Sequence, residues 1–116
     1  MKVLGINLSH NASFSIVENG ELILSLEQER VSRQKRDNQI NRLCEGLKNS
    51  HFEIIGYTSY NMVDEKVESY TDLVKYCLKK NNITYDKLIP YDEHHLTHCY
   101  SSFYNSGFDE AVCLII

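Results

Sequence analysis

The densest group of side chains with metal-binding or catalytic chemistry is a histidine cluster late in the chain. Three of the five histidines, His94, His95 and His98, lie within one short stretch. On a helix, His94 and His98 would share one face with Cβ atoms about 5–6 Å apart, so that both imidazoles could bind one metal ion. The zinc-protease pattern HExxH is absent, because position 95 is histidine rather than glutamate. A solvated helix end with incidental histidines is the alternative interpretation.

A second candidate site directly follows the first predicted strand, in the sequence Ser9-His10-Asn11. A histidine in a polar turn at the carboxyl end of a strand stands where α/β sheets usually bind ligands. Imidazole titrates near neutral pH, so His10 is a candidate for proton transfer, and the Asn11 amide could donate to a phosphate or carbonyl oxygen. The alternative is an ordinary turn that is held by local hydrogen bonds.

A short basic segment interrupts an otherwise acidic chain, whose formal net charge is -4. It contains Arg30, Arg33 and Lys35, followed by Arg36. Guanidinium groups bind phosphates in bidentate fashion, so a phosphorylated or nucleotide substrate would suit this segment. It is too short and too interleaved with glutamate for DNA or RNA, which require clustered Lys and Arg. A solvated loop of mixed charge is the alternative.

The hydrophobic pattern predicts the elements that would position these residues. Apolar and polar residues alternate early in the chain, and Asn19-Gly20 is typical of a tight hairpin turn. The expected strands are 3–8, 11–17, 21–26, 53–60, 87–89 and 111–116, and the expected helices are 38–48, 64–80 and 94–104, the last with Asp92 as N-cap. This order, β-β-β-α-β-α-(β)-α-β, predicts an α/β domain with a mixed sheet.

Composition places the chain among globular proteins. Of its 116 residues, 42% are hydrophobic and 24% are charged, which is close to the globular average. No apolar run approaches the roughly 20 residues that a membrane span needs, and the N-terminus does not have the pattern of a secretory signal. The four cysteines form no CxxC pair, so we expect reduced thiols and a cytoplasmic protein without nucleic-acid or membrane partners.

The three candidate segments occur in an order that resembles a known family. The residues Lys2-Val3-Leu4-Gly5-Ile6 and His10-Asn11-Ala12-Ser13 resemble the start of the nodulation-protein and antibiotic O-carbamoyltransferases. Residues 27–35 resemble the acidic-basic segment that this family has after its third strand, and residues 94–104 resemble its HHxxHxxS segment. The resemblance covers nearly the whole chain, and its specificity comes from the three motifs occurring together.

The resemblance implies a ribonuclease-H-like fold of the sugar-kinase and actin superfamily. It implies transfer of a carbamoyl group from carbamoyladenylate, made from carbamoyl phosphate and ATP in a separate YrdC-like domain, to a hydroxyl of a small acceptor. It also implies a divalent metal, commonly iron, with His94 and His98 as ligands and His10 at the transfer centre. The chemistry of their side chains, rather than the resemblance, adds Asn11 as a candidate at that centre and Arg30, Arg33 and Lys35 as candidate phosphate ligands.

The resemblance further implies that residues 1–116 are the N-terminal part of a carbamoyltransferase domain. We expect the other half of the fold, further carboxylate ligands and the YrdC-like domain to lie elsewhere, so that the isolated chain is inactive. Cys99 departs from the family, which more often has alanine there. Two alternatives remain: a non-catalytic nucleotide-binding or regulatory module of the same fold, and a small zinc-binding interaction domain using His94, His98, Cys99 and Cys113.

Overall fold

The computed structural model describes residues 1–8, 11–58, 60–63 and 66–115. They form an α/β domain with a mixed five-stranded sheet and a separate two-stranded hairpin. The large sheet contains β1 (Lys2–Asn7), β2 (Ser13–Glu18), β3 (Glu21–Glu27), β4 (His51–Thr58) and β7 (Thr84–Tyr91). The hairpin pairs β5 (Tyr60–Val63) with β6 (Lys66–Ser69), and the helices are α1 (Gln28–Ser32), α2 (Asn41–Gly46), α3 (Thr71–Lys80) and α4 (His94–Ser106).

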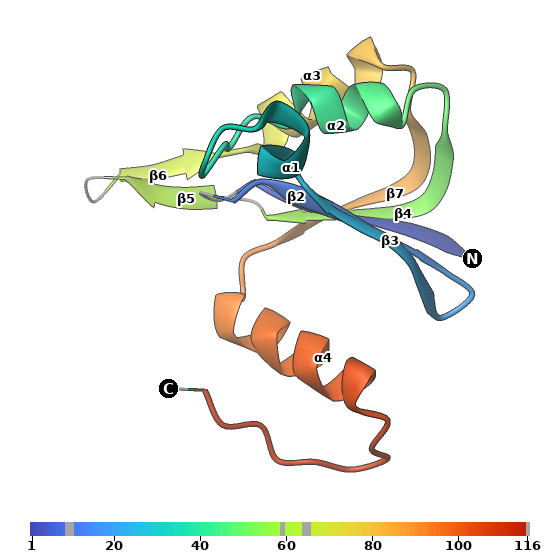
Figure 1. The fold of residues 1–116 in the computed structure, drawn as a ribbon, viewed down its shortest axis with the longest axis vertical. Helices are drawn as coiled ribbons and strands as arrows, with labels where there is room; N and C mark the ends of the chain where they lie inside the picture. The colour runs from blue at the N-terminus through green and yellow to red at the C-terminus, as the bar shows by residue number, and fades with distance from the viewer. Residues whose placement is uncertain (9–10, 59, 64–65, 116) are drawn as a thin grey trace.

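The strand order across the large sheet is β3-β2-β1-β4-β7. The first three strands form an antiparallel meander, whereas β4 and β7 run parallel to β1. Parallel neighbours require crossover connections, and these contain α1 and α2 before β4 and α3 before β7. Figure 1 shows α1, α2 and α3 on one face of the sheet and α4 on the other side.

The turn between β2 and β3 confirms the predicted hairpin. Glu18 pairs with Glu21, so the loop contains only Asn19 and Gly20. Both have positive φ, at 51° and 83°, which is the backbone that a type I′ turn requires and that Asn-Gly tolerates. The ammonium group of Met1 donates to Asn19 Oδ1 over 2.6 Å, which fastens the chain start to this turn.

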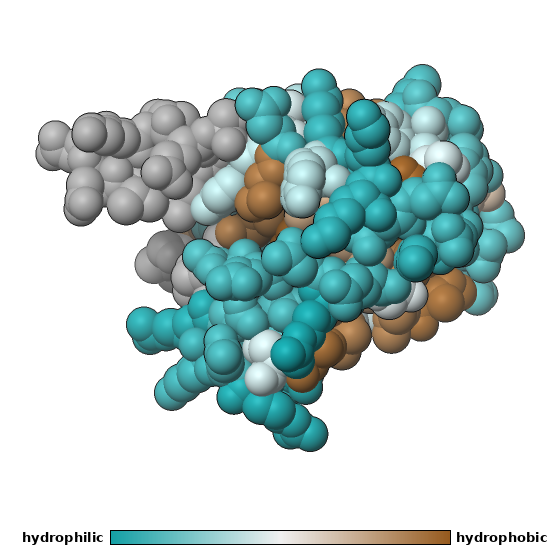
Figure 2. All heavy atoms as spheres, turned by 90° about the horizontal axis from the view of Figure 1, so that it is seen from above, coloured by the Kyte–Doolittle hydropathy of each residue, from teal (hydrophilic) through white to brown (hydrophobic). Residues whose placement is uncertain are grey.

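The core lies between the sheet and the helices α2 and α3. Alternate residues of the strands point to this face because side chains along a strand alternate between its two sides. The buried core residues include Leu4, Ile6, Phe14, Ile16, Ile55 and Tyr57 from the sheet, Leu43 and Cys44 from α2, and Val74, Cys77 and Leu78 from α3. Figure 2 views the molecule from the helix side and shows mainly hydrophilic side chains over this layer. The helices are therefore amphipathic covers of one sheet face.

The opposite sheet face has a different character. The strand register places small residues side by side across its middle, from Ser25 through Ser15 and Gly5 to Gly56. The hydroxyls of Ser15 and Ser25 lie 3.0 Å apart and share a hydrogen bond. A Cβ atom added at Gly56 would meet nothing within 4 Å. This face is thus open at its centre, although α4 lies on its side of the sheet (Figure 1).

Two predicted elements are wrong in part. The helix predicted at 64–80 begins only at Thr71, because residues 66–69 pair with β5 as strand β6. The strand predicted at 111–116 is absent from residues 111–115, and Ile116 lies outside the described residues. An apolar run becomes a strand only where a neighbouring strand can accept its hydrogen bonds, and this segment lies beside α4 instead (Figure 1).

Two further elements differ from the predictions. The short strand predicted at 87–89 is the eight-residue β7, which continues through Pro90. Proline is tolerated there because β7 is an edge strand, whose outer side has no ladder to which a backbone N–H must donate. The five-residue helix α1 was not predicted, since its polar sequence Gln28-Glu29-Arg30 carries no apolar stripe.

Candidate functional site

The predicted metal-binding pair, His94 and His98, is brought together in the first turn of α4. Their Nε2 atoms lie 3.1 Å apart, and their rings meet edge to face with centroids 4.5 Å apart. Two nitrogens bound to one metal ion at about 2.0–2.1 Å each cannot lie more than about 4.2 Å apart, so this separation allows a shared ion. The pair therefore fits as two imidazole ligands.

His95 belongs to a different face of α4. Its ring centroid lies 5.8 Å from that of His94, and the two rings are tilted by 56°. All three histidines are exposed. Among the residues that the structure describes, no group of three His, Cys, Asp or Glu side chains is arranged to hold a metal ion. Within the described residues, the structure thus brings two histidines together without a third metal-binding side chain beside them.

Helix α4 has Glu93, rather than the predicted Asp92, at its N-cap position. Glu93 occupies the N-cap position, and its carbonyl accepts hydrogen bonds from the backbone and the hydroxyl of Thr97, each over 3.0 Å. The helix ends at Gly107, whose φ of 75° lies in the left-handed region that glycine adopts without strain. The turn that carries His94 and His98 therefore begins directly after Glu93.

The other predicted catalytic residues follow β1. His10 lies outside the described residues. Asn11 is exposed, and its backbone carbonyl accepts a hydrogen bond of 2.9 Å from the Asn7 side chain. Nearby, the Leu8 amide donates to Thr58 Oγ1 over 2.9 Å, which ties the end of β1 to the end of β4. The Asn11 segment is therefore anchored at the carboxyl edge of the parallel strands.

The basic segment is folded against this same edge through Ala12. The Ala12 amide donates to the Asp37 carbonyl over 3.1 Å, and the Ala12 carbonyl accepts from the Gln28 amide over 2.7 Å. Gln28 begins α1 and Asp37 follows the basic residues, so both ends of the basic segment meet the residue after Asn11. Two predicted sites that are separate in sequence are thus neighbours in the fold.

The positively charged side chains of this segment face solvent. Arg30 lies on α1, and Arg33 and Lys35 lie on the turn that follows. Arg33 has φ 62° and closes α1 by donating its amide to the Glu29 carbonyl over 2.9 Å. The Arg36 amide donates to the Glu29 carboxylate over 3.1 Å. The turn is therefore held by its backbone, and the three predicted phosphate ligands remain exposed.

Asp37 fixes the far end of the basic turn. Hydrogen bonds from the Ser32 side chain and from the Gln39 backbone, followed by smaller contributions from Gln28 and Arg42, lower the pKa of its carboxyl group below the usual value. The Gln39 amide lies 2.9 Å from Asp37 Oδ1 and the Gln28 side chain lies 3.3 Å from Oδ2. The ionised carboxylate thus organises the turn.

Tyr91 is a residue of this region that the sequence did not single out. It ends β7, immediately before the segment that leads into α4. Its hydroxyl oxygen is buried and has no hydrogen-bond partner among the described residues. Desolvation and then the neighbouring Tyr100 hydroxyl raise the pKa of Tyr91. In the sequence, the only pointer to Tyr91 is its position between Pro90 and Asp92, beside the histidine segment, and that signal is weak.

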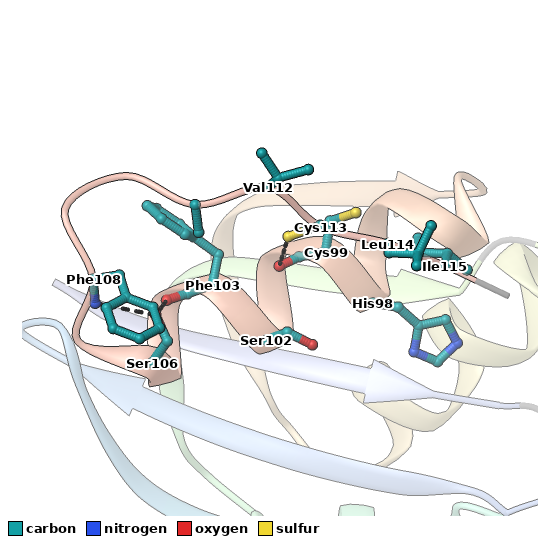
Figure 3. A pocket seen from close by; sticks show the side chains of 11 residues that line it. His98, Cys99, Ser102, Phe103, Ser106, Phe108, Val112, Cys113, Leu114 and Ile115 are labelled. Carbon is teal, nitrogen blue, oxygen red and sulfur yellow. Dashed lines mark hydrogen bonds between the residues drawn. The ribbon is translucent and has the colours of Figure 1, made fainter.

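A groove separates α4 from the segment that follows it (Figure 3). Its volume is about 510 Å³, and His98 stands at its wall. The walls are largely apolar, with contributions from Phe103, Phe108, Val112, Leu114 and Ile115. Cys113 Sγ lies 3.8 Å from the Cys99 carbonyl and donates a weak hydrogen bond to it. Desolvation, followed by the Cys113 thiol, raises the pKa of Cys99.

Comparison with known proteins adds no homologue to this picture. The sequence matches no model of a known protein family, and it matches no curated protein. Within the described part of the chain, no helix is both long and apolar enough to cross a membrane. Functional inference therefore depends on the arrangement of the residues themselves and on the motif resemblance described above.

Proposed function

We propose that the chain is part of an O-carbamoyltransferase that binds a divalent metal ion through His94 and His98. The observation that carries the proposal is the 3.1 Å approach of the two Nε2 atoms at the start of α4. This turn follows the carboxyl end of β7, and Asn11 follows the carboxyl end of the parallel strand β1. Ligands of open α/β sheets usually bind at this edge.

The finer fold assignment, a ribonuclease-H-like sheet that forms part of an actin or sugar-kinase-like domain, is also a proposal. Its support is the order β3-β2-β1-β4-β7, in which an antiparallel meander is extended by two parallel strands. The crossover helices α2 and α3 cover one face of the sheet (Figure 1). This arrangement is what the fold implied by the motif resemblance would require.

In this proposal the metal, iron in the motif-related enzymes, would act as a Lewis acid on a phosphate or carbonyl oxygen. His94 and His98 would hold it together with ligands from outside the described residues. Asn11 would donate to a carbonyl or phosphate oxygen at the same sheet edge, and His10 would accept the proton of the attacking hydroxyl. The acceptor would be a small hydroxyl compound, and carbamoyl phosphate and ATP would be co-substrates of the full-length enzyme.

The basic turn has a specific part in this proposal. Arg30, Arg33 and Lys35 are exposed on a turn that Ala12 connects to Asn11, so they would neutralise phosphate groups close to the transfer centre. Holding the phosphate of carbamoyladenylate would orient its carbamoyl group toward the acceptor hydroxyl. Substitution of these residues should therefore raise the KM for the phosphorylated substrate more than it lowers kcat.

Metal analysis of the full-length enzyme tests the proposal. We expect near-stoichiometric divalent metal in the wild type and at least about a tenfold weaker affinity in His94→Ala and in His98→Ala. His95→Ala is the matched control, because its ring lies on another face of the same helix turn. Unchanged metal content in both first variants would contradict the proposal, and nucleotide binding without metal would favour a regulatory module.

A further inference from the structure

The two outer strands of the large sheet differ in how well their free edges are protected. Among the described strands, the sheet order places β3 at one end and β7 at the other. An outer strand leaves one row of backbone N–H and C=O groups without a ladder partner, and proteins commonly protect such a row with lysine or proline. Strand β7 contains both, as Lys87 and Pro90, whereas the β3 sequence ELILSLE contains neither. The edge of β3 is therefore the more open to another strand.

Apolar side chains lie exposed along this open edge. Leu22, Ile23 and Leu24 are 57%, 56% and 42% exposed. The register with β2 passes directly from Leu22 to Leu24 and skips Ile23. In Figure 1 the turn before β3 projects away from α1, α2 and α3. Strand β3 thus combines a free backbone edge with three consecutive apolar side chains that an added strand could cover.

The two ends of β3 carry negative charge. Glu21 begins the strand, Glu27 ends it, and both are exposed. Neither carboxylate forms an ion pair with another described residue. In full antiparallel register, a second copy of β3 would place Glu21 opposite Glu27 twice, and like charges directly opposite each other destabilise strand pairing. The charges thus favour a partner with lysine or arginine at these positions over a second copy of the chain.

We propose that β3 is a docking strand for an extended segment of another protein, which adds to the sheet as a sixth strand. Main-chain hydrogen bonds to the free edge would supply affinity, and side-chain pairs would supply specificity. The segment carries apolar residues beside Leu22 and Leu24 and a basic residue opposite each of Glu21 and Glu27. Because β3 lies at the opposite end of the sheet from β7, which leads into the histidine helix, this docking does not depend on metal binding.

A synthetic peptide tests the proposal on the folded chain. The probe is fluorescently labelled Lys-Val-Thr-Val-Thr-Val-Lys, and its matched control, Glu-Val-Thr-Val-Thr-Val-Glu, reverses only the charges at the two ends. By fluorescence anisotropy we expect the basic peptide to bind at least about tenfold more tightly, because each end changes from an attractive to a repulsive pair. Its affinity should fall as the salt concentration rises. Hydrogen exchange should slow at the amides of β3 and stay unchanged at those of β7.

Substitutions then assign the binding to β3. Ile23→Lys places a positive charge in the middle of the docking strand, so it should abolish binding of the basic peptide at concentrations that saturate the wild type. Ile89→Lys is the matched control, because Ile89 is 42% exposed on the other outer strand, and it should leave the affinity unchanged. Exchanging both end charges, by Glu21→Lys with Glu27→Lys, should reverse the preference in favour of the acidic peptide. Circular dichroism verifies that each variant is folded.

Four results would overturn the proposal. The first is equal affinity for the two peptides, including no binding of either. The second is a preference for the basic peptide that survives the exchange of both glutamates. The third is slower exchange in β7 rather than in β3. The fourth is concentration-dependent dimerisation of the chain that Ile23→Lys abolishes, because the occupant of β3 would then be a second copy.

Discussion

The sheet with its covering helices differs from the later helix α4 in how many side chains are buried. Every buried hydrophobic residue among the described ones lies between Leu4 and Ile83. Helix α4 is longer than any of the other described helices, yet none of its residues is buried. In Figure 1 it stands apart from the sheet, on the side away from α1, α2 and α3. The described core residues therefore all precede the histidine segment in the sequence.

This difference separates stability from the candidate chemistry. Helices in proteins owe most of their stability to packing of an apolar face, and no residue of α4 is buried. Its exposed apolar side chains include Leu96, Tyr100 and Tyr104. Changes in the first region should alter the free energy of unfolding, whereas changes in α4 should alter metal binding or local order. The following predictions test this division.

The largest expected effect is a pair of aromatic truncations. Phe52 on β4 is completely buried, so Phe52→Ala should lower the free energy of unfolding by about 3–5 kcal/mol through lost burial and a residual cavity. Tyr104 on α4 is 75% exposed, so Tyr104→Ala should change it by no more than about 0.5 kcal/mol. Urea denaturation measures both. Similar losses in the two variants would show that α4 contributes to the core after all.

A smaller effect is expected at the end of α4. Gly107 has φ 75°, a conformation that costs about 1 kcal/mol when a Cβ atom is present. Gly107→Ala should therefore increase hydrogen exchange within α4 and leave exchange in the sheet unchanged. Gly46→Ala on α2 is the control, because Gly46 has no positive φ and open space around its Cα. Faster exchange throughout the chain would argue that the two regions unfold together.

The smallest effect concerns the basic turn. The pKa of Asp37 is lower in the folded chain than in the unfolded chain, so its ionised carboxylate stabilises the fold at pH values above the unfolded-state pKa, near 3.8. This contribution disappears as the pH falls through the lower folded-state pKa. Asp37→Asn should thus lower Tm at pH 7, and the two proteins should converge in strong acid. Thermal unfolding across this pH range measures the difference. A constant gap at every pH would mean that the charge of Asp37 is irrelevant.

The first strands could be predicted because local signals agreed. Alternation in β2 and the Asn19-Gly20 turn predicted strands joined by a tight hairpin, and β2 pairs with β3 across that two-residue loop, with an irregularity between Ile16 and Val17 that was not predicted. The pairing of His94 with His98 also followed from helical spacing alone. These features depend on residues that are close in sequence, so no knowledge of distant contacts was needed.

The remaining features depend on contacts between distant residues. Nothing in the sequence of residues 66–69 distinguishes a strand from the start of a helix until their pairing with β5 is known. Similarly, the two hydrogen bonds of Ala12, which bring the basic turn beside Asn11, join segments that no periodicity relates. The histidine pair was predictable, whereas its separation from the core was not, because burial is a property of the whole fold.

The parallel course of β1, β4 and β7 also determines how the domain would respond to mechanical force. Met1 precedes the start of β1, and α4 follows the end of β7. Tension applied at the two ends of the chain would first extend α4, which has no buried residues to resist it. The load would then run along the parallel strands and shear their hydrogen bonds together rather than one at a time. Helix α4 would therefore extend at a lower force than the force needed to separate the parallel strands.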